Sequence, residues 1–474
     1  MDNSSKTQLA IIGSGPGGYN AAFRAADLGL DVTLIDKNNS LGGVCLNRGC
    51  IPSKSLLHIS KIINEAKHSS KIGVKFSEPE INLDKIHKWK NKIINDLNKG
   101  IESLAKARRV NLINGTAKFL SANQLSITDN QEKNIKLEFD NCIIASGSKS
   151  SVIPALDKSH PSILYSKDAL NFNKIPKRLL VIGGGYIGLE LATVFNSLGS
   201  KITIAEFLPS LLSMIDDDLL KPLSDKFEKN CENIYLSTEV TSLVPQADNS
   251  VVVSFKQKNK EFKDVFDNVL ICAGRTPNTS NLNLLKAGIE LDSRGFIPVN
   301  NQRRTLIPNI YAIGDVTGDP MLAHKASFEG KVAAEVIAGQ NAIYEPVAVP
   351  SVIYTSPEIA WAGFTEKELK EQSIKYNKSE FPWSANGRAM TMNATEGKTK
   401  ILTNLEKTQI LGVGIVGDNA GDLISEAMLA LEMNANPEDI GMTIHPHPTL
   451  SETIANSSEI ITGSITELYI PKKL

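Results

Sequence analysis

The chain of 474 residues lacks three features, and each absence narrows its function. No apolar run approaches the ~18 residues that cross a membrane, so we expect no membrane partner. The net charge is only −1 at pH 7, which gives no reason to expect nucleic acid. Just five cysteines occur, too few for the disulfide framework of a secreted protein. Residues 1–8 are polar and resemble no targeting segment, so the expected location is cytoplasmic.

The bulk composition is that of an ordinary globular protein. Hydrophobic residues make up 41% of the chain and charged residues 22%. The chain is too long for a single hydrophobic core, and about 150 residues per domain predicts roughly three domains.

Two of the five cysteines, Cys45 and Cys50, are separated by only four residues. On an uninterrupted helix their Cα atoms would lie roughly 8 to 9 Å apart, beyond the ~7 Å limit for a disulfide. Gly49 gives the backbone the freedom to break the helix between them, which favours a redox-active disulfide. A metal site is not expected, because no second pair of cysteine or histidine has zinc-ligand spacing. Two unrelated buried thiols remain the alternative.

The other three cysteines, Cys142, Cys231 and Cys272, lie in apolar contexts and are predicted to be inert core residues.

The first chemical motif is a glycine turn between a strand and a helix. The apolar run 9–12 leads into Gly13, Gly15 and Gly18, and a helix-like segment follows to residue 28. Such a turn lets a pyrophosphate approach the helix N-terminus. Asp36 ends the next strand, 18 residues after Gly18, where an acid can bond a ribose hydroxyl. This spacing predicts a dinucleotide site.

A second copy of the same pattern begins at residue 179. Its glycines are Gly183, Gly185 and Gly188, and Glu206 again stands 18 residues after the last of them. Two copies imply two dinucleotides. Glu206 repels a 2′-phosphate, and residues 207–212 contain no arginine to receive one, so the second site is predicted to bind NAD rather than NADP.

Between and after these copies, periodicity predicts further elements. A helix over 84–108 is expected to bury one stripe, namely Ile86, Trp89, Ile93, Leu97, Ile101 and Leu104, and to keep its lysine-rich face in water. Alternating segments over 110–139 predict antiparallel strands, and residues 148–154 are expected to form a linker. From about residue 346 the chain alternates strands with helices, as in an α+β domain with a sheet available for dimerisation.

Near the end of the chain, His447 precedes Pro448, which is expected in the first turn of a helix running to residue 462. Glu452 would then lie one and a half turns further on. A histidine oriented by a carboxylate is the usual general base. A histidine at a helix entrance is on its own more often a cap or packing residue, and the reactive cysteine pair elsewhere favours the base.

Together these motifs resemble the pyridine-nucleotide disulfide oxidoreductases over nearly the whole chain. The resemblance is carried by the segment 42–54, the two glycine turns, and the segments 274–278, 314–315, 321–326, 350–358 and 447–452.

The resemblance implies the cofactors and most of the site. It implies FAD on the first turn, with further contacts from Lys54, Ala117, Ser146, Gly147, Ser148, Asp315, Met321, Leu322, Ala323 and His324. It implies NAD on the second, with Glu190, Val240 and Gly274. It also implies that Lys54 and Glu190 pair beside the flavin.

Within the family, the features of this chain imply oxidation of protein-bound dihydrolipoamide, with electrons passing through the cysteine pair and FAD to NAD⁺. Cys45 would receive the substrate sulfur, Cys50 would lie beside the flavin, and His447 with Glu452 would serve the opposite subunit of a homodimer. The implied partners are lipoyl domains and the peripheral-subunit-binding domain of 2-oxo acid dehydrogenase complexes, or a glycine cleavage system.

The predicted fold is α/β, with two Rossmann-like dinucleotide-binding domains and an α+β C-terminal dimerisation domain. We expect an FAD-binding domain with the redox disulfide over 1–150, an NAD-binding domain over 151–275, a central domain completing the FAD site over 276–345, and an interface domain over 346–474.

Members of the family that act on other substrates each carry a feature that is missing here. Glutathione and trypanothione reductases carry basic residues after the position of Glu206. Mercuric reductase and the large thioredoxin reductase carry a thiol pair or its selenium counterpart at the C-terminus, where residues 469–474 have none. The flavoprotein transhydrogenase typically lacks the paired cysteines. The alternative from another functional class is that the chain is a non-catalytic FAD-binding scaffold or an adhesin. Four positions depart from the family pattern without removing a chemical group: Asp36 replaces glutamate, Arg48 replaces an apolar residue, and Ser327–Phe328 replace an acidic pair.

Overall fold

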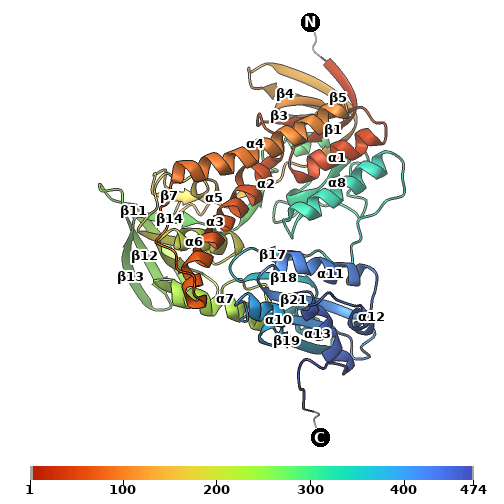
Figure 1. Cartoon of the computed structure of the whole chain (residues 1–474). Helices are drawn as coiled ribbons and strands as arrows, with labels where there is room; N and C mark the ends of the chain where they lie inside the picture. Colours follow the sequence, from red (N-terminus) through yellow and green to blue (C-terminus); the bar gives the residue numbers. More distant parts are fainter. Residues whose placement is uncertain (1–3, 472–474) are drawn as a thin grey trace.

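The computed structural model describes residues 4–471 (Figure 1). Residues 1–3 of the polar opening and residues 472–474 of the cysteine-free end lie outside the described part. The structure contains three groups of strands and helices, and segments that follow the second group in the chain complete the first one. Within residues 4–471, no helix combines the length and the apolar character needed to cross a membrane.

The first group is built on a sheet of parallel strands that continues into an antiparallel meander. β1 lies between β2 and β5, and all three are parallel, while β4 joins β3 to β5 by antiparallel pairing. The strands are β1 (Ser4–Ile12), β2 (Val32–Asp36), β3 (Asn111–Ser121), β4 (Gln124–Asp129), β5 (Asn134–Ile144) and β16 (Ile310–Ala312). The antiparallel strands predicted over 110–139 are therefore confirmed.

Two helices cover this sheet together. α1 (Pro16–Asp27) packs against α8 (Ala323–Ile337), although some 300 residues separate them (Figure 1). An ideal Cβ added to Gly330 would lie 2.5 Å from the Gly17 carbonyl oxygen, so only glycine permits this approach. Helix α8, which comes after the second group in the chain, therefore packs beside the first glycine turn.

The helices between β2 and β3 are α2 (Gly43–Arg48), α3 (Cys50–His68), η1 (Ser69–Ile72) and α4 (Leu83–Ala107), and α3 also packs against the second group. The buried stripe predicted for α4 is wrong in part. Trp89, Leu97 and Leu104 are exposed. Lys90 and Asn98 are buried instead, because Lys90 donates to the Leu170 carbonyl oxygen and to Asn171, and Asn98 donates to Asn47. The buried face of α4 therefore combines Lys90 and Asn98 with the apolar Ile101 and Ala105, and periodicity of apolar residues could not predict its polar part.

The second group repeats the parallel arrangement with strand order β10-β9-β8-β14-β7. These strands are β7 (Ile163–Tyr165), β8 (Arg178–Ile182), β9 (Lys201–Ala205), β10 (Asn233–Tyr235) and β14 (Asn268–Ile271), with helices α5 (Ser166–Ala169), α6 (Tyr186–Ser197) and α7 (Asp217–Asn230). A three-stranded antiparallel sheet lies beside them, made of β11 (Thr238–Pro245), β12 (Val251–Gln257) and β13 (Lys260–Phe266). Each group has its own buried apolar core.

Residues 148–150, which were expected to belong to an open linker between the first two groups, form part of a small sheet instead. β6 (Ser148–Ser150) pairs antiparallel with β15 (Arg275–Pro277). Two short 3-10 helices, η2 (Leu284–Ala287) and η3 (Gly314–Thr317), follow in the central segment. Residues 148–150 are therefore fixed by backbone pairing.

The third group is an antiparallel sheet of order β17-β18-β21-β20-β19 with helices around it. Its elements are β17 (Ser351–Ile353), β18 (Glu358–Gly363), α9 (Glu366–Glu371), β19 (Asn377–Pro382), η4 (Trp383–Ala385), α10 (Gly387–Thr391), β20 (Lys398–Thr403), β21 (Ile410–Gly417), α11 (Ala420–Glu432), α12 (Pro437–Met442) and α13 (Glu452–Thr462). Pro448 does not lie in the first turn of α13, contrary to the prediction, because Glu452 begins the helix and accepts a hydrogen bond from the Thr449 amide.

Candidate active site and nucleotide sites

The two predicted glycine turns have the same geometry. Gly13 and Gly183 both have positive φ, at +105° and +103°, and an ideal Cβ there would lie 2.3 and 2.5 Å from a carbonyl oxygen of Ala145 and Cys272. These conformations need glycine. Each turn brings the end of a strand to the first turn of a helix, α1 in the first copy and α6 in the second.

The middle glycine of each turn leaves open space beside the main chain. An ideal Cβ on Gly15 or on Gly185 would meet nothing within 4 Å. By contrast, a Cβ on Gly18 or Gly188 would lie 1.8 or 2.3 Å from the carbonyl oxygen of the first glycine, which is close helix packing. Open space at a helix N-terminus fits a pyrophosphate, whose charge the helix dipole favours.

The acid that follows each turn is held by its own turn. Glu206 accepts the Gly184 amide at 2.5 Å and the Leu208 amide at 2.7 Å. A carboxylate offers about four acceptor positions. Glu206 therefore keeps capacity for a ligand hydroxyl.

Asp36 differs from Glu206 in how many donors it already holds. The Ser14 amide and hydroxyl lie 2.8 and 2.7 Å from Oδ2, and the Asn38 amide and side-chain nitrogen both lie 2.8 Å from Oδ1. These four donors fill the acceptor positions of the carboxylate. A ribose hydroxyl would have to replace the Ser14 hydroxyl or the Asn38 side chain.

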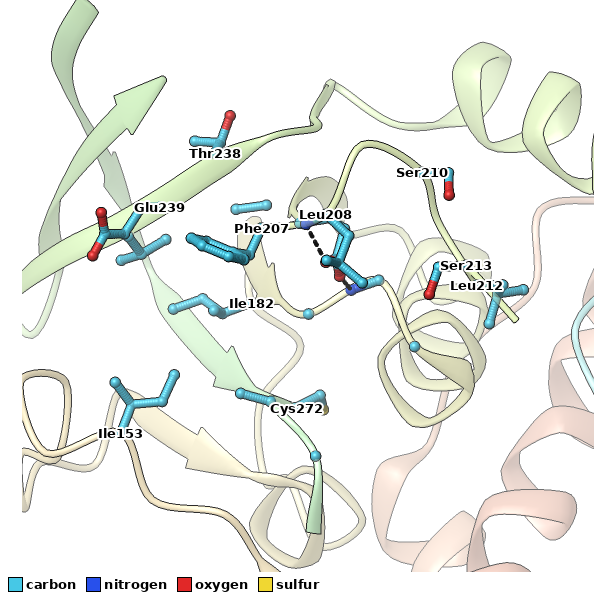
Figure 2. Close-up of a pocket in the computed structure, with 18 of the residues that line it drawn as sticks. Ile153, Ile182, Phe207, Leu208, Ser210, Leu212, Ser213, Thr238, Glu239 and Cys272 are labelled. Atoms are coloured by element: carbon cyan, nitrogen blue, oxygen red, sulfur yellow. Dashed lines mark hydrogen bonds between the residues drawn. The ribbon is translucent and has the colours of Figure 1, made fainter. Parts of the chain in front are cut away.

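A pocket of about 460 Å³ opens at the second turn (Figure 2). Its lining includes Gly183, Gly185, Glu206, Val240 and Gly274, so five of the predicted nucleotide residues meet there. Gly188 packs behind the turn, and Glu190 points elsewhere. None of the described residues that line the pocket is a lysine or an arginine that could receive a 2′-phosphate. This agrees with the predicted preference for NAD over NADP.

The two cysteines lie on consecutive helices, Cys45 in α2 and Cys50 at the start of α3. The break between the helices falls at Gly49, as predicted, and a Cβ there would lie 3.0 Å from the Val44 carbonyl oxygen. Both are free thiols that share a side-chain hydrogen bond rather than a disulfide. Helix α2 rests on the first glycine turn, where a Cβ on Gly43 would lie 2.6 Å from the Gly15 Cα.

The two thiols are electrostatically unequal. The hydrogen bond from Cys45, aided by the Lys54 ammonium and opposed by burial, lowers the pKa of Cys50 from 9.0 to about 7. The same hydrogen bond, together with burial, raises the pKa of Cys45. The direction of these shifts makes Cys50 the more acidic thiol of the pair. Of the other cysteines, Cys142 is fully buried as predicted, whereas Cys231 and Cys272 are only partly buried and Cys272 lines the second nucleotide pocket. Burial raises the pKa of Cys231 and of Cys272 to about 12.

The predicted ion pair between Lys54 and Glu190 is present beside the cysteines. Lys54 Nζ lies 2.9 Å from both carboxylate oxygens of Glu190. Tyr354 was not predicted here: its ring centroid lies 4.3 Å from Lys54 Nζ, and its amide donates to Glu190 at 3.1 Å. The Pro350–Glu358 segment thus reaches the cysteine site, which its residues alone do not indicate.

Because only a thiolate is alkylated, the reaction of reduced Cys50 with iodoacetamide is expected to rise with pH around a midpoint near 7. Cys45→Ala removes the hydrogen-bond donor and should move that midpoint upward, toward the 9.0 of an ordinary thiol. Alkylation rates at Cys50, followed by peptide mass spectrometry after dithiothreitol reduction, measure both. A midpoint near 9 in the unmodified chain would contradict the lowered pKa.

Several other residues predicted to contact the first nucleotide lie close together, near the pairing of β6 with β15. Ser146 exchanges hydrogen bonds of 2.9 Å with Asn278, and Gly147 accepts the Asn278 amide. The Ser148 hydroxyl donates to Asp315 and accepts from Arg275 at 2.7 Å. These contacts hold the end of β5 against η3.

Further predicted contacts come from β3 and from the start of α8. Ala117 is buried on β3, whereas Met321, Leu322 and Ala323 lead into α8. His324 Nε2 donates to the Pro350 carbonyl oxygen at 2.8 Å and so ties this segment to the third group.

A fully buried carboxylate behind η3 was also not predicted. Glu329 accepts the Gly314 amide at 2.6 Å and pairs with Arg303 at 2.9 Å and Lys325 at 3.1 Å. It orients Gly314 and hence Asp315. The helix α8 also contains Lys325, Lys331 and Glu335, so nothing in the sequence singled out Glu329.

His447 does not meet the cysteines within the chain. Its Nδ1 lies 2.8 Å from Glu452 Oε1, which confirms the predicted pairing and leaves Nε2 free, and its side chain is 76% exposed. In Figure 1, α13 lies on the far side of the third group from α2. The histidine is thus available to another molecule and not to the thiols of its own chain.

Comparison with known proteins places this arrangement in a family. Residues 7–330 match the pyridine nucleotide-disulphide oxidoreductase model, and residues 349–458 match the dimerisation domain of the same family. The chain therefore belongs to the pyridine nucleotide-disulphide oxidoreductase family. Domains of this family bind FAD and NAD, and the two open glycine turns fit such dinucleotides.

Curated relatives cover almost the whole chain. The dihydrolipoyl dehydrogenase of Vibrio cholerae is 45% identical over 99% of this chain and 98% of its own length, and that of Staphylococcus aureus is 42% identical over 97% of both. Among solved structures, LpdA from Mycobacterium tuberculosis shares the fold with a TM-score of 0.90, at 24% identity over 96% of this chain and 99% of that one. The flavoprotein disulfide reductase RclA from Escherichia coli has a TM-score of 0.85 at 25% identity, over 96% and 100%.

Proposed function

We propose that this chain catalyses the NAD⁺-dependent oxidation of protein-bound dihydrolipoyl groups. The observation that supports it most is the Cys45–Cys50 pair, held against the first nucleotide turn and flanked by Lys54 and Glu190. The names of relatives about 45% identical over the full length support the choice of substrate.

The chemistry at the cysteines is thiol–disulfide exchange. His447 of one subunit takes a proton from a substrate thiol, and the resulting thiolate attacks the Cys45 sulfur of the oxidised pair. The Cys45–Cys50 bond breaks, and Cys50 leaves as a thiolate, which its pKa of about 7 favours. The second substrate thiol then attacks the mixed disulfide, which releases Cys45 and the oxidised lipoyl group.

Bound FAD supplies the route by which the electron pair leaves the dithiol for NAD⁺. Lys54 places its ammonium near Cys50, where it stabilises the thiolate, whereas the Glu190 carboxylate opposes the thiolate and holds Lys54 in place. Glu452 keeps the proton on Nδ1 of His447, so Nε2 is the base, and it stabilises the imidazolium that forms.

The site residues are assigned to the cofactors as follows. We assign FAD to Gly13, Gly15, Gly18, Asp36, Lys54, Ala117, Ser146–Ser148, Asp315 and Met321–His324, and NAD to Gly183, Gly185, Gly188, Glu190, Glu206, Val240 and Gly274. In domain terms, 1–150 would bind FAD, 151–275 NAD, 276–345 would complete the FAD site and 346–474 would form the interface.

A homodimer follows from the position of His447. A base that faces away from its own thiols needs a second copy to reach a disulfide. Exposed apolar side chains beside it, Leu429, Met433, Met442 and Ile444, offer the surface for that contact. The dimer would work in the cytoplasm and serve lipoyl domains and the peripheral-subunit-binding domain of 2-oxo acid dehydrogenase complexes, or a glycine cleavage system.

One assay tests the proposal directly. Purified FAD-loaded protein mixed with dihydrolipoamide and NAD⁺ should form NADH, followed by its absorbance, with a rate at least about tenfold above that with NADP⁺, because Glu206 repels a 2′-phosphate. The same protein should fail with glutathione and NADP⁺. No NADH from dihydrolipoamide, in protein that carries FAD and thiols reducible by dithiothreitol, would overturn the assignment.

A further inference from the structure

Residues 207–216, called the pocket segment below, form one wall of the second nucleotide pocket. Ser210, Leu212, Ser213 and Met214 line the pocket, and Figure 2 shows Ser210, Leu212 and Ser213 on one side of it. The Leu212 amide donates to the Gly184 carbonyl oxygen at 3.1 Å. A displacement of the pocket segment would therefore disturb the glycine turn itself.

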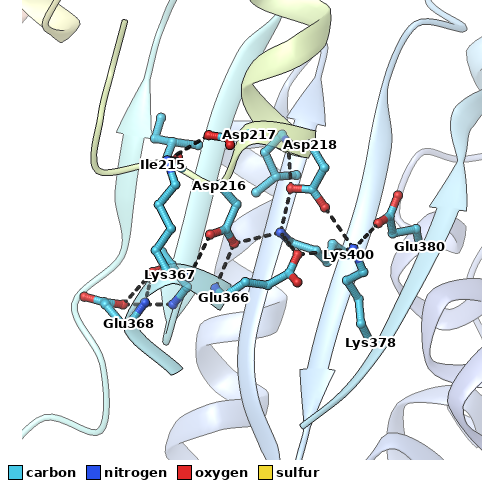
Figure 3. A network of polar contacts seen from close by, with 12 residues as sticks. Ile215, Asp216, Asp217, Asp218, Glu366, Lys367, Glu368, Lys378, Glu380 and Lys400 are labelled. Carbon is cyan, nitrogen blue, oxygen red and sulfur yellow. Dashed lines mark hydrogen bonds and ion pairs between the residues drawn. The ribbon is translucent and has the colours of Figure 1, made fainter. Parts of the chain in front are cut away.

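The far end of the pocket segment is held by a lysine of the third group. Lys367, on α9, directs its Nζ at the Ile215 carbonyl oxygen at 2.5 Å and at that of Ser213 at 3.3 Å, and it pairs with Asp217 at 2.9 Å (Figure 3). The Lys367 backbone amide donates to Asp216 at 3.1 Å. One residue thus makes four contacts with residues 213–217.

A buried ionic cluster lies beneath this contact. Lys400 is almost completely buried, and its Nζ lies 2.7 Å from Asp216, 2.8 Å from Asp218 and 3.0 Å from Glu366 (Figure 3). Removing Lys400 would leave three carboxylates without their buried cation, which costs several kcal/mol of fold stability. Lys367, with 35% of its side chain exposed, can be changed without that penalty.

We propose that Lys367 is a positioning residue for NAD binding, acting from the third group through the carbonyl oxygens of Ser213 and Ile215. Its ammonium holds the pocket segment against the glycine turn, so the pocket wall is in place before the nucleotide arrives. This inference rests on the proposed assignment of the pocket to NAD. It adds a residue that does not line the pocket and lies on α9, in the third group.

Lys367→Met tests the inference in the FAD-loaded protein. The Kd for NAD⁺, measured by calorimetry on the oxidised protein, and the KM for NAD⁺ are expected to rise about fivefold or more, since coupling free energies are commonly of that size, whereas kcat should change by less than about twofold. Lys367→Arg keeps a cation within reach of the two carbonyl oxygens and should restore most of the affinity. A residue with only a structural role would not produce this split between KM and kcat.

Two further variants separate the possible outcomes. Lys370→Met, on the same helix with its side chain 67% exposed, is the matched control and should bind NAD⁺ as the unmodified protein does. An affinity of Lys367→Met equal to that of Lys370→Met would overturn the inference. Glu206→Ala tests the pocket: unchanged NAD⁺ affinity there would overturn the nucleotide assignment instead. Should Lys367→Met fail to fold, Lys367→Gln is measured under the same criteria.

Discussion

Replacing Cys50 by serine is expected to lower dihydrolipoamide oxidation by at least about 10³-fold, as removal of a reacting nucleophile does in other enzymes. The serine cannot form a disulfide with Cys45, and no thiolate of pKa about 7 remains. FAD binding should persist, because the first glycine turn and α2 do not use this side chain. The measurements are NADH formation with dihydrolipoamide, and flavin absorbance of the purified protein.

Cys45→Ser is the informative partner of that variant. It too should lose activity, yet it retains Cys50 and a hydroxyl that can donate to it, so the Cys50 thiolate should persist. Bound oxidised FAD should then show a long-wavelength absorbance band from an adjacent thiolate, and this band should be absent in Cys50→Ser. Cys231→Ser, whose thiol has a pKa raised by burial, is the control and should keep both activity and the ordinary flavin spectrum. A band in Cys50→Ser and none in Cys45→Ser would mean that Cys45, not Cys50, is the thiolate next to the flavin.

His447→Gln is expected to lower dihydrolipoamide oxidation by at least about 10², the usual contribution of a general base. Oxidation of NADH by an artificial electron acceptor should be largely kept, because that reaction needs no thiol deprotonation. The two rates, measured on the same preparation, give the ratio. Equal loss of both would refute the role of His447 as the base.

The neighbouring His445 provides a matched control for this prediction. His445 also pairs with a carboxylate, Glu426 at 2.7 Å, but only 8% of its side chain is exposed. His445→Gln should retain most of the activity. Mixing Cys50→Ser and His447→Gln subunits should also restore part of the activity, since a mixed dimer has one site with an intact cysteine pair and an intact partner histidine. No recovery, with subunit exchange demonstrated, would place the histidine and cysteines in one chain.

The fold class and the two nucleotide units were predictable because they rest on local rules. The need for positive φ at Gly13 and Gly183, and the fixed offset to Asp36 and Glu206, are properties of short segments, and the structure confirms both strand–turn–helix units. Gly49 likewise ends α2 as expected. The cofactor roles of these residues stay predictions, supported by the family.

What could not be predicted depends on contacts between distant segments. Part of the buried face of α4 is polar because Lys90 finds carbonyl acceptors about 80 residues away. Tyr354 reaches Lys54, and Lys367 reaches Ile215, from the third group of strands and helices. The start of α13 was misplaced because Glu452 holds the Thr449 amide, a choice that the proline at 448 does not reveal. Neither periodicity nor spacing carries such information.

The contact between Gly43 and Gly15 bears on how the surroundings of the two sulfurs can change during evolution. Since bare main chain sets the approach of α2 to the first turn, no side chain has to be conserved in size to keep that approach. Arg48, exposed between the two cysteines, illustrates the freedom that results. Substitutions around the reactive pair can alter its electrostatic surroundings and leave its distance to the nucleotide unchanged.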